Sequence, residues 1–395
     1  MTGPKYGMQR MLLWSFLILR SLGLAPYVNV NGRCKKSQVY MGIGIAIQTV
    51  VFSSAAYGLI EMINIFPVMK SEVYTMALWL YAPFYNGMMM LVSFHFITSS
   101  AHVVRIVRYL NGSSTSPKSV SKSQYILAAL IVITTCQLLY SAAMSKYASK
   151  KLMHSLLVTS GQTLIQLCYL GLPFILYSLM KLLAVELRQS TSLFLIQKHN
   201  RFSDTHKYLA KRTEELAEPD LANVRISVMK IRRAAIATHK AFSGVVLGAI
   251  VFGQYQVVLA VLFALLNRSR GNSAVTALFF TFPTALQLYL LLDSQTEYLK
   301  VCEERVKRVR KLTAAAGQMG PQNWKAVWQL HAIKAELKSM PRFFVFGLFE
   351  LSRRCLLSMG SIALTYVIIA VQFTTSNSPV TCKAFAATAN LSAEV

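Results

Sequence analysis

The chain has 395 residues, of which 54% are hydrophobic and only 14% are charged, and its mean hydropathy is +0.44. Soluble domains carry about 25% charged residues, so this composition excludes that class and indicates a polytopic membrane protein. The formal net charge of +26 is carried mainly by segments between hydrophobic runs, which is the pattern of membrane topology rather than of nucleic-acid binding. We therefore expect the lipid bilayer as a partner, and no nucleic acid.

Residues 1–36 form the predicted cytoplasmic N-terminal segment. Its nine-residue apolar run, Met11–Leu19, lies between two arginines, and no small-residue cleavage pattern follows it cleanly. A cleaved signal peptide stays an alternative, but the pattern favours a short cytoplasmic or interfacial helix. The stretch from Gly23 to Pro26 is predicted to end this helix, because the residue before a proline disfavours helical geometry.

Seven charge-free or nearly charge-free runs are each long enough to cross a bilayer, which takes about 20 residues. An all-α fold with seven transmembrane helices is therefore predicted, with helices 1–6 in residues 37–293. The runs are Ser37–Ile60, Val73–Val104, Ser123–Ser145, Leu152–Met180, Ala241–Asn267, Gly271–Leu292 and residues 355–376.

The positions of Lys and Arg predict the orientation of these helices. Of the 41 basic residues, 33 lie in residues 1–36, 105–122, 188–240 and 300–354. The positive-inside rule places these segments and the N-terminus in the cytoplasm. The tail, 377–395, is then extracellular, an orientation opposite to that of G-protein-coupled receptors.

Two cytoplasmic segments are predicted to be structured. Residues 188–240 and 294–354 are rich in helix formers, with apolar residues three and four positions apart. This favours amphipathic helices packed into a cytoplasmic domain, and the candidates for its core are Trp324, Val327, Trp328 and Leu330. The alternative is solvated basic linkers attracted to anionic lipid.

The last predicted membrane helix, residues 355–376, carries a stripe of polar side chains. They recur at steps of three, four and seven, so they share one side of a helix. One interpretation is that this side packs inside its own bundle; the other is that it lines a pore assembled from several copies of the helix. The stripe consists of Ser358, Ser361, Thr365, Gln372 and Thr375.

Within this helix, Thr365-Tyr366, five hydrophobic residues and Gln372-Phe373 make the sequence TYVIIAVQF. It resembles the signature of insect gustatory receptors, seven-helix ligand-gated ion channels related to insect odorant receptors, and the order of the other segments agrees with it. The resemblance implies a non-selective cation channel in the plasma membrane of sensory neurons, opened by a small tastant. It also implies that residues 355–376 line the pore, with a gate at Gln372 and Phe373 supported by Thr365 and Tyr366. The cytoplasmic helices would form an anchor that joins four subunits of the same or a related receptor.

A pocket for the tastant is predicted in the outer halves of the membrane helices. Aromatic faces and a few amides supply the stacking area and the orienting hydrogen bonds that such a ligand needs. The alternative is that many of these residues belong to an interfacial aromatic belt or to the core. The candidates are Trp79, Tyr81, Tyr140, Gln162, Gln166, Gln254 and Phe280.

The sequence has no motif for a metal site, a catalytic nucleophile or a phosphate-binding loop, so neither an enzyme nor a cofactor is predicted. The seven histidines are scattered singly, and none of the seven runs contains an acidic residue. His95 is therefore interpreted as an interhelical hydrogen-bonding residue rather than a proton or metal site. A G-protein-coupled metabotropic receptor and a transporter stay the alternative functions, and the class of ligand, sugar or bitter, is left open.

Overall fold

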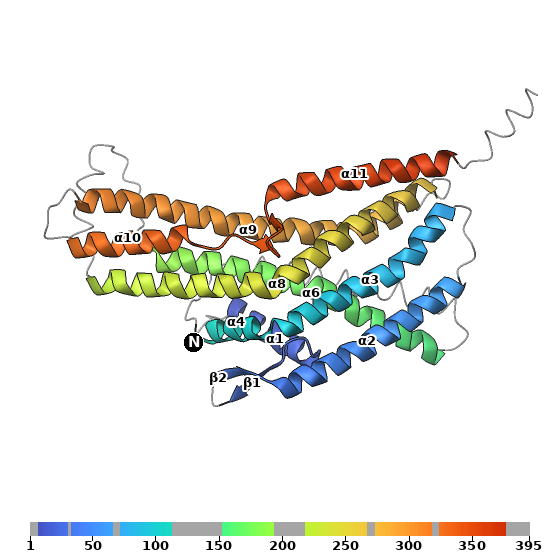
Figure 1. Cartoon of the computed structure of the whole chain (residues 1–395), viewed down its shortest axis with the longest axis horizontal. Coiled ribbons are helices and arrows are strands. Elements are labelled where there is room, and N and C mark those ends of the chain that lie inside the picture. Colours follow the sequence, from blue (N-terminus) through green and yellow to red (C-terminus); the bar gives the residue numbers. More distant parts are fainter. Residues whose placement is uncertain are drawn as a thin grey trace, which may run out of the picture.

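The computed structural model describes residues 7–30, 33–65, 72–112, 152–192, 218–266, 273–317 and 324–376. Long helices dominate this part of the chain, and most of them run along the long axis of the molecule (Figure 1). The helices are α1 (Gly7–Ser21), α2 (Gln38–Ile65), α3 (Glu72–Thr98), α4 (Ser100–Gly112), α6 (Leu152–Ser190), α8 (Glu218–Leu266), α9 (Ser273–Gly317), α10 (Trp324–Lys338) and α11 (Arg353–Ser376). The strands are β1 (Tyr27–Val30), β2 (Arg33–Lys36), β3 (Phe344–Val345) and β4 (Phe349–Glu350).

Six of the seven predicted membrane runs lie on helices of this fold, namely on α2, α3 with the start of α4, α6, α8, α9 and α11. The run Ser123–Ser145 lies outside the described residues. By length and apolar composition alone, α8 qualifies as a membrane span among the described helices, and the α3–α4 pair qualifies as a broken one bent by 63°. Ser99 lies at this bend, beside Ser100, and adjacent serines are a common cause of sharp kinks.

The predicted boundaries between membrane and cytoplasmic segments fall inside continuous helices. The expected ends at Met180, Ala241 and Leu292 are interior residues of α6, α8 and α9, which extend far beyond them. Pro173 also lies within α6 without ending it, as membrane helices allow when neighbouring groups satisfy the freed carbonyl. Helix-forming residues continue across each boundary, so each helix runs on from its apolar part into its charged part.

The charged parts of α8 and α9 pack against α10, seen at the left of Figure 1, and the cytoplasmic location of this domain stays a prediction. Leu330, Ile333 and Leu337 of α10 are buried against α8 and α9. Arg232 of α8 also forms an ion pair of 2.8 Å with Glu336. The interpretation as a packed domain is therefore correct for these helices, but two expected core residues are not in it. Trp324 and Trp328 are exposed.

A network of ion pairs joins α6 to α9 on the cytoplasmic side of the predicted membrane runs. Lys181 contacts Glu297 and lies 3.4 Å from Asp293, while Arg188 lies 3.0 Å from Glu297. Burial alone would lower the pKa of Lys181. The neighbouring carboxylates outweigh it and raise this pKa above its usual value, with Glu297 contributing more than Asp293. Two helices that are far apart in the sequence are thus fixed against each other just beyond the predicted membrane runs.

The N-terminal segment begins with the predicted helix. Helix α1 ends at Ser21, just before the Gly23–Pro26 stretch, and it buries Leu12 and Phe16 in the core while Trp14 stays exposed. This combination fits the expected interfacial helix, because one face packs on protein and the other carries large apolar groups.

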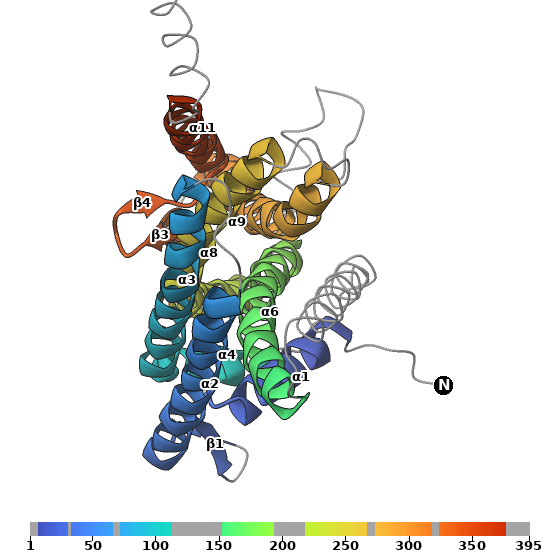
Figure 2. The ribbon, with the colours of Figure 1, turned by 90° about the vertical axis from the view of Figure 1, so that its right-hand side faces the viewer.

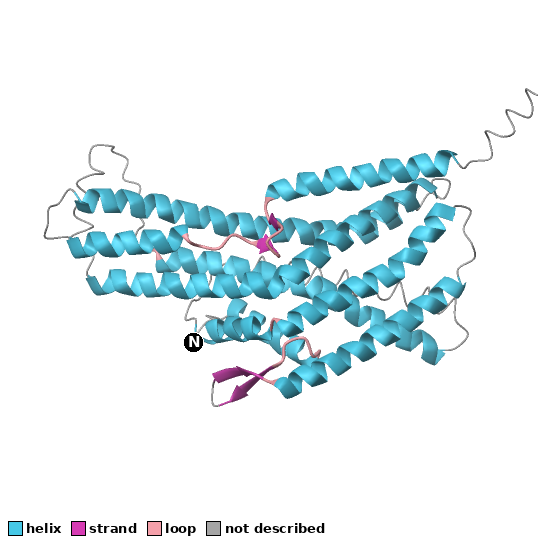
Figure 3. Cartoon of the chain, viewed as in Figure 1, coloured by secondary structure: helices cyan, strands magenta, loops and turns pink. Residues whose placement is uncertain are grey.

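Two β-hairpins, β1–β2 and β3–β4, were not predicted from the sequence (Figure 3). The second lies between α10 and α11, in a segment expected to be helical. Its turn residues Phe346 and Gly347 have φ angles of 50° and 76°. Two consecutive positive φ angles are typical of a tight hairpin turn, and glycine adopts them without strain. A phenylalanine adopts a positive φ angle rarely, so Phe346 is not a residue from which a turn is predicted.

Candidate pore helix and the cavity at its base

Helix α11 lies along the edge of the bundle and packs mainly on α8, with smaller contacts to α3 and α9 (Figures 1 and 2). Its packed face repeats every four residues. Met359 is buried with 8% of its surface exposed, and the rest of this face is half-buried. These residues are Cys355, Met359, Ala363, Val367 and Val371.

The polar stripe of α11 lies on the opposite face, roughly 180° around the helix from the packed residues. Ser358, Ser361, Thr365 and Gln372 are all exposed. The three hydroxyls donate to carbonyls of their own helix, at 3.5 Å for Ser358, 3.0 Å for Ser361 and 2.9 Å for Thr365. The interpretation in which the stripe packs inside its own bundle is therefore wrong: the stripe faces away from it.

Large apolar side chains are exposed on both sides of this stripe. Leu357 is 77% exposed and Leu364 is 61% exposed on one flank, while Ile362 and Ile369 are exposed on the other. An exposed apolar surface of this kind marks contact with lipid or with another protein chain. Helix α11 thus presents a polar line between two apolar borders.

The structure places the four motif residues on the half of α11 that leads away from the cytoplasmic domain. Thr365 and Gln372 lie on the exposed polar face, and Tyr366 is 60% exposed. Phe373 belongs to α11, but its side chain is outside the described part. The gating role of this pair stays a prediction.

The predicted tastant pocket also stays a prediction. Gln254 is half-buried on α8, and Tyr140 lies outside the described residues. The remaining candidates belong to described helices, but their side chains are not described: they are Trp79 and Tyr81 on α3, Gln162 and Gln166 on α6, and Phe280 on α9.

Two aromatic rings of neighbouring helices contact each other near the pocket candidates on α3 and α8. Phe84 of α3 and Tyr255 of α8 lie with their ring centroids 5.2 Å apart. Since α3 and α6 both pack on α8, and α6 and α8 both pack on α9, the candidates do come from neighbouring helices.

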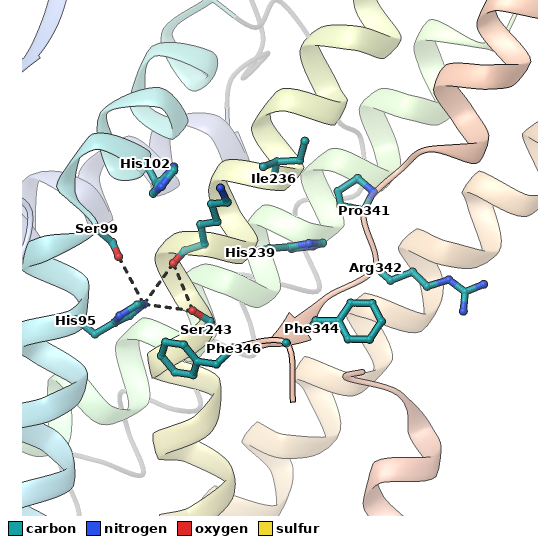
Figure 4. A pocket seen from close by; sticks show the side chains of 12 residues that line it. His95, Ser99, His102, Ile236, His239, Ser243, Pro341, Arg342, Phe344 and Phe346 are labelled. Carbon is teal, nitrogen blue, oxygen red and sulfur yellow. Dashed lines mark hydrogen bonds between the residues drawn. The ribbon is translucent and has the colours of Figure 1, made fainter. Parts of the chain in front are cut away.

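A cavity of about 480 Å³ lies at the other end of α11, where the β3–β4 hairpin meets the α3–α4 bend and α8 (Figure 4). The sequence did not predict it. Its lining is rich in basic and aromatic side chains and contains no carboxylate. It consists of His95, Ser99, His102, Ile236, His239, Lys240, Ser243, Pro341, Arg342, Phe344, Phe346 and Gly347.

His95 makes interhelical hydrogen bonds to α8, as predicted from the sequence. Its Nε2 lies 3.2 Å from the Ser243 hydroxyl and 3.3 Å from the Lys240 carbonyl oxygen. The ring fits against α8 because residue 244 is glycine: a Cβ there would lie 2.6 Å from the ring. Gly248 likewise faces Val92, so α3 and α8 meet at a Gly-x-x-x-Gly motif, which allows close helix approach in membranes.

The histidine of α8 in this cavity, His239, differs from His95. It is 7% exposed and its ring packs 4.5 Å from that of Phe343, centroid to centroid. Burial lowers the pKa of the His239 imidazole to about 3. The nearby Arg342 backbone acts in the opposite sense, but its effect is smaller. Neither ring nitrogen makes a hydrogen bond of ordinary geometry. His239 is thus a neutral, buried residue with its polar atoms unpaired.

Sequence reasoning missed this cluster because its members are far apart in the chain. The available signals were the Gly-x-x-x-Gly motif of α8 and the position of His102 and Lys240 at the ends of predicted membrane runs. Within the described part of the chain, no group of three or more His, Cys, Asp or Glu side chains is arranged to hold a metal ion. The histidines of this cavity therefore do not form such a group.

Comparisons with known proteins give the family. The sequence model of the 7tm chemosensory receptor family matches residues 12–377. The fold is similar to that of the insect olfactory receptor OR5 from Machilis hrabei, with a TM-score of 0.61, 14% identity, and coverage of 92% of this chain and 98% of the other.

The structure of the same receptor in complex with eugenol gives a TM-score of 0.63 at 12% identity, with coverage of 93% and 98%. No curated protein sequence matches. The family match covers nearly the whole chain, and the likeness to a solved chemosensory receptor agrees with it in fold. The chain therefore belongs to the 7tm chemosensory receptor family.

Proposed function

We propose that this protein is a gustatory receptor that acts as a ligand-gated, non-selective cation channel in the plasma membrane of sensory neurons. The observation that carries the proposal is the orientation of α11. Its polar stripe faces away from its own bundle, between two exposed apolar borders. One helix cannot enclose water, so this face acquires a function when several copies meet around an axis.

Four subunits, of this chain or of a related receptor, would complete such a pore. Each contributes one α11, with Ser358, Ser361, Thr365 and Gln372 toward the axis and the flanking apolar residues against neighbouring helices. Hydroxyl and amide groups replace part of the hydration shell of a passing cation without binding it tightly, which suits a channel of low selectivity. The cytoplasmic domain of α8, α9 and α10 would hold the subunits together.

The gate is proposed at Gln372 and Phe373. A ring of Phe373 closes a pore by excluding water, and a ring of Gln372 closes it by hydrogen bonding across the axis. Because the cytoplasmic domain is at the other end of α11, this gate lies toward the extracellular side in the predicted orientation.

The ligand is proposed to be a small tastant bound between α3, α6, α8 and α9. The complex of OR5 with eugenol shows a small aromatic molecule bound by a protein of similar fold. In this chain the aromatic and amide candidates on the same four helices supply comparable chemistry. Binding opens the pore only to the extent that the ligand prefers the open conformation.

The test is expression in an otherwise silent cell with whole-cell recording, while a panel of sugars and plant alkaloids is applied. The proposal predicts a ligand-evoked cation current that persists when G-protein activation is blocked with a non-hydrolysable guanosine diphosphate analogue in the pipette. A response that disappears under this block would support the metabotropic alternative and contradict the channel.

A further inference from the structure

The cavity at the base of α11 combines positive charge, unpaired hydrogen-bond donors and an open side. Lys240 and Arg342 both line it, and no lining residue is acidic. Arg342 forms an ion pair of 3.3 Å with Glu350 on the exposed hairpin, and its guanidinium points away from the other lining residues (Figure 4). Lys240 is exposed and takes part in no ion pair within the described residues, so its charge is uncompensated there.

Three ring nitrogens line the same space, and a neutral imidazole offers one N–H donor and one acceptor nitrogen. His239 has two unpaired ring nitrogens although it is more than nine-tenths buried, and Nδ1 of His102 is also buried and unpaired. The cationic groups of Lys240 and Arg105 lie within Coulomb range of His102. Buried polar atoms without partners are costly, and a ligand that carries both acceptor oxygens and hydroxyl groups would satisfy the donor and the acceptor nitrogens. The chemistry of the lining therefore fits an anion rather than a cation or a neutral apolar molecule.

The position of the cavity fits the cytoplasmic surface of the membrane. Lys240 directly precedes the predicted run Ala241–Asn267, and the run Val73–Val104 ends beside His102. Anionic headgroups of the inner leaflet lie at this level. The volume of about 480 Å³ exceeds what one phosphate fills and lies in the range of small-ligand sites. Phe344 and Phe346 supply apolar walls for a ring that carries the phosphates.

We propose that this cavity binds a phosphate ester, in the form of a phosphorylated inositol headgroup, and thereby fixes the β3–β4 hairpin to α8. Phe346 already contacts His95 through rings 5.0 Å apart, and Leu351 donates to the Phe343 carbonyl oxygen at 2.8 Å. A headgroup held by Lys240 of α8 and packed against Phe344 and Phe346 of the hairpin strengthens the connection between α8 and the start of α11. The ligand thus acts at the joint from which the proposed pore helix extends.

The binding test uses the purified full-length receptor in phosphatidylcholine nanodiscs, with a fluorescent short-chain phosphatidylinositol 4,5-bisphosphate as the probe. Saturable binding is expected, and Lys240→Gln should weaken it by about tenfold, the scale of one lost charge-assisted hydrogen bond. Lys230→Gln is the matched control: it removes an exposed charge from the same helix about 15 Å away, and it should change the affinity less than twofold.

Two further arms identify the source of the phosphate ester. Competition by soluble inositol 1,4,5-trisphosphate at similar concentration would show that a free headgroup occupies the site, whereas binding of the lipid without such competition would assign the site to the membrane. Nanodiscs with phosphatidylserine at equal charge control for bulk attraction. Absent probe binding, or equal losses for Lys240→Gln and Lys230→Gln, would overturn the proposal. This assay needs no current, so its failure is distinguishable from a failure of the proposed channel function.

Discussion

At the scale of single residues, two kinds of polar side chain differ. One kind bonds to a neighbouring helix, and the other bonds to its own helix and faces outward. His95 lies between α3 and α8 and bonds to both the backbone and a serine of α8. Ser361 and Thr365 bond only to their own helix in the described structure and face outward. The first arrangement holds the subunit together, and the second is available to an assembly.

The gate pair gives the first prediction. Phe373→Ala should raise the ligand-independent current, because it removes the largest ring from the proposed constriction, and Gln372→Ala should change conductance or gating. Val367→Ala, on the packed face, is the control and should leave open-channel conductance unchanged. Whole-cell recording with surface labelling checks this. Wild-type basal current and ligand response in both gate variants at normal surface levels would show that the pair has a packing role.

A second prediction concerns Glu186, whose carboxyl accepts a hydrogen bond from the Tyr109 hydroxyl. Burial raises the pKa of Glu186 from 4.5 to about 7. The folded state then binds more protons than the unfolded state between these values, so stability falls as pH rises through this window, by up to about 3 kcal/mol. The apparent Tm of the purified receptor should therefore drop between pH 5.5 and pH 8.

Glu186→Gln keeps the shape of this side chain and removes its titration. Its apparent Tm should change much less over the same pH range. If wild type and variant lose the same number of degrees, the pH dependence comes from other groups and the assignment to Glu186 is wrong.

At the scale of elements, the sequence predicted helix positions well and helix ends poorly. Apolar runs identified the helices α2, α3, α6, α8, α9 and α11, because a bilayer requires them to be apolar over a fixed length. A change from apolar to charged residues predicts a helix boundary, but the helices continue through it, since both parts consist of helix formers. The β3–β4 hairpin could not be predicted, because its turn places Phe346 in a conformation that phenylalanine seldom adopts.

The third prediction tests the contact between α3 and α8. Gly244→Ala would place a Cβ 2.6 Å from the His95 ring, so α3 must move away and the apparent Tm should fall by several degrees. Gly87→Ala on α3 is the control, since its Cβ would meet no atom within 4 Å. That change should be neutral or slightly stabilising, because alanine favours helix over glycine. Equal effects of the two substitutions in thermal unfolding would contradict the close packing.

At the scale of the whole molecule, the described helices share a packed interior, while the outer face of α11 exposes a polar stripe and large apolar side chains. The candidate pore face of α11 belongs to this exposed side. Periodicity and the motif at Thr365–Phe373 select candidate residues on α11, but periodicity alone does not tell whether the stripe faces inward or outward. That depends on which face packs on α8, and the packed residues Met359 and Val367 are no more apolar than exposed Leu364.

The fourth prediction concerns orientation in the membrane. An epitope tag before Met1 should be accessible to antibody only after permeabilisation, and a tag after Val395 should be accessible on intact cells. The physical reason is the concentration of Lys and Arg in the cytoplasmic domain. Labelling of intact cells at the N-terminal tag alone would reverse the topology and place the proposed gate on the cytoplasmic side.

The central claim is that the outward polar face of α11 lines a pore, and cysteine accessibility tests it most directly. Thr365→Cys places a thiol on the polar face, Ala363→Cys places one on the face packed against α8, and the wild type controls for native cysteines. A charged methanethiosulfonate reagent applied to open channels should reduce the current through Thr365→Cys and leave the Ala363→Cys and wild-type currents unchanged. Loss of current in Ala363→Cys with none in Thr365→Cys would contradict the account.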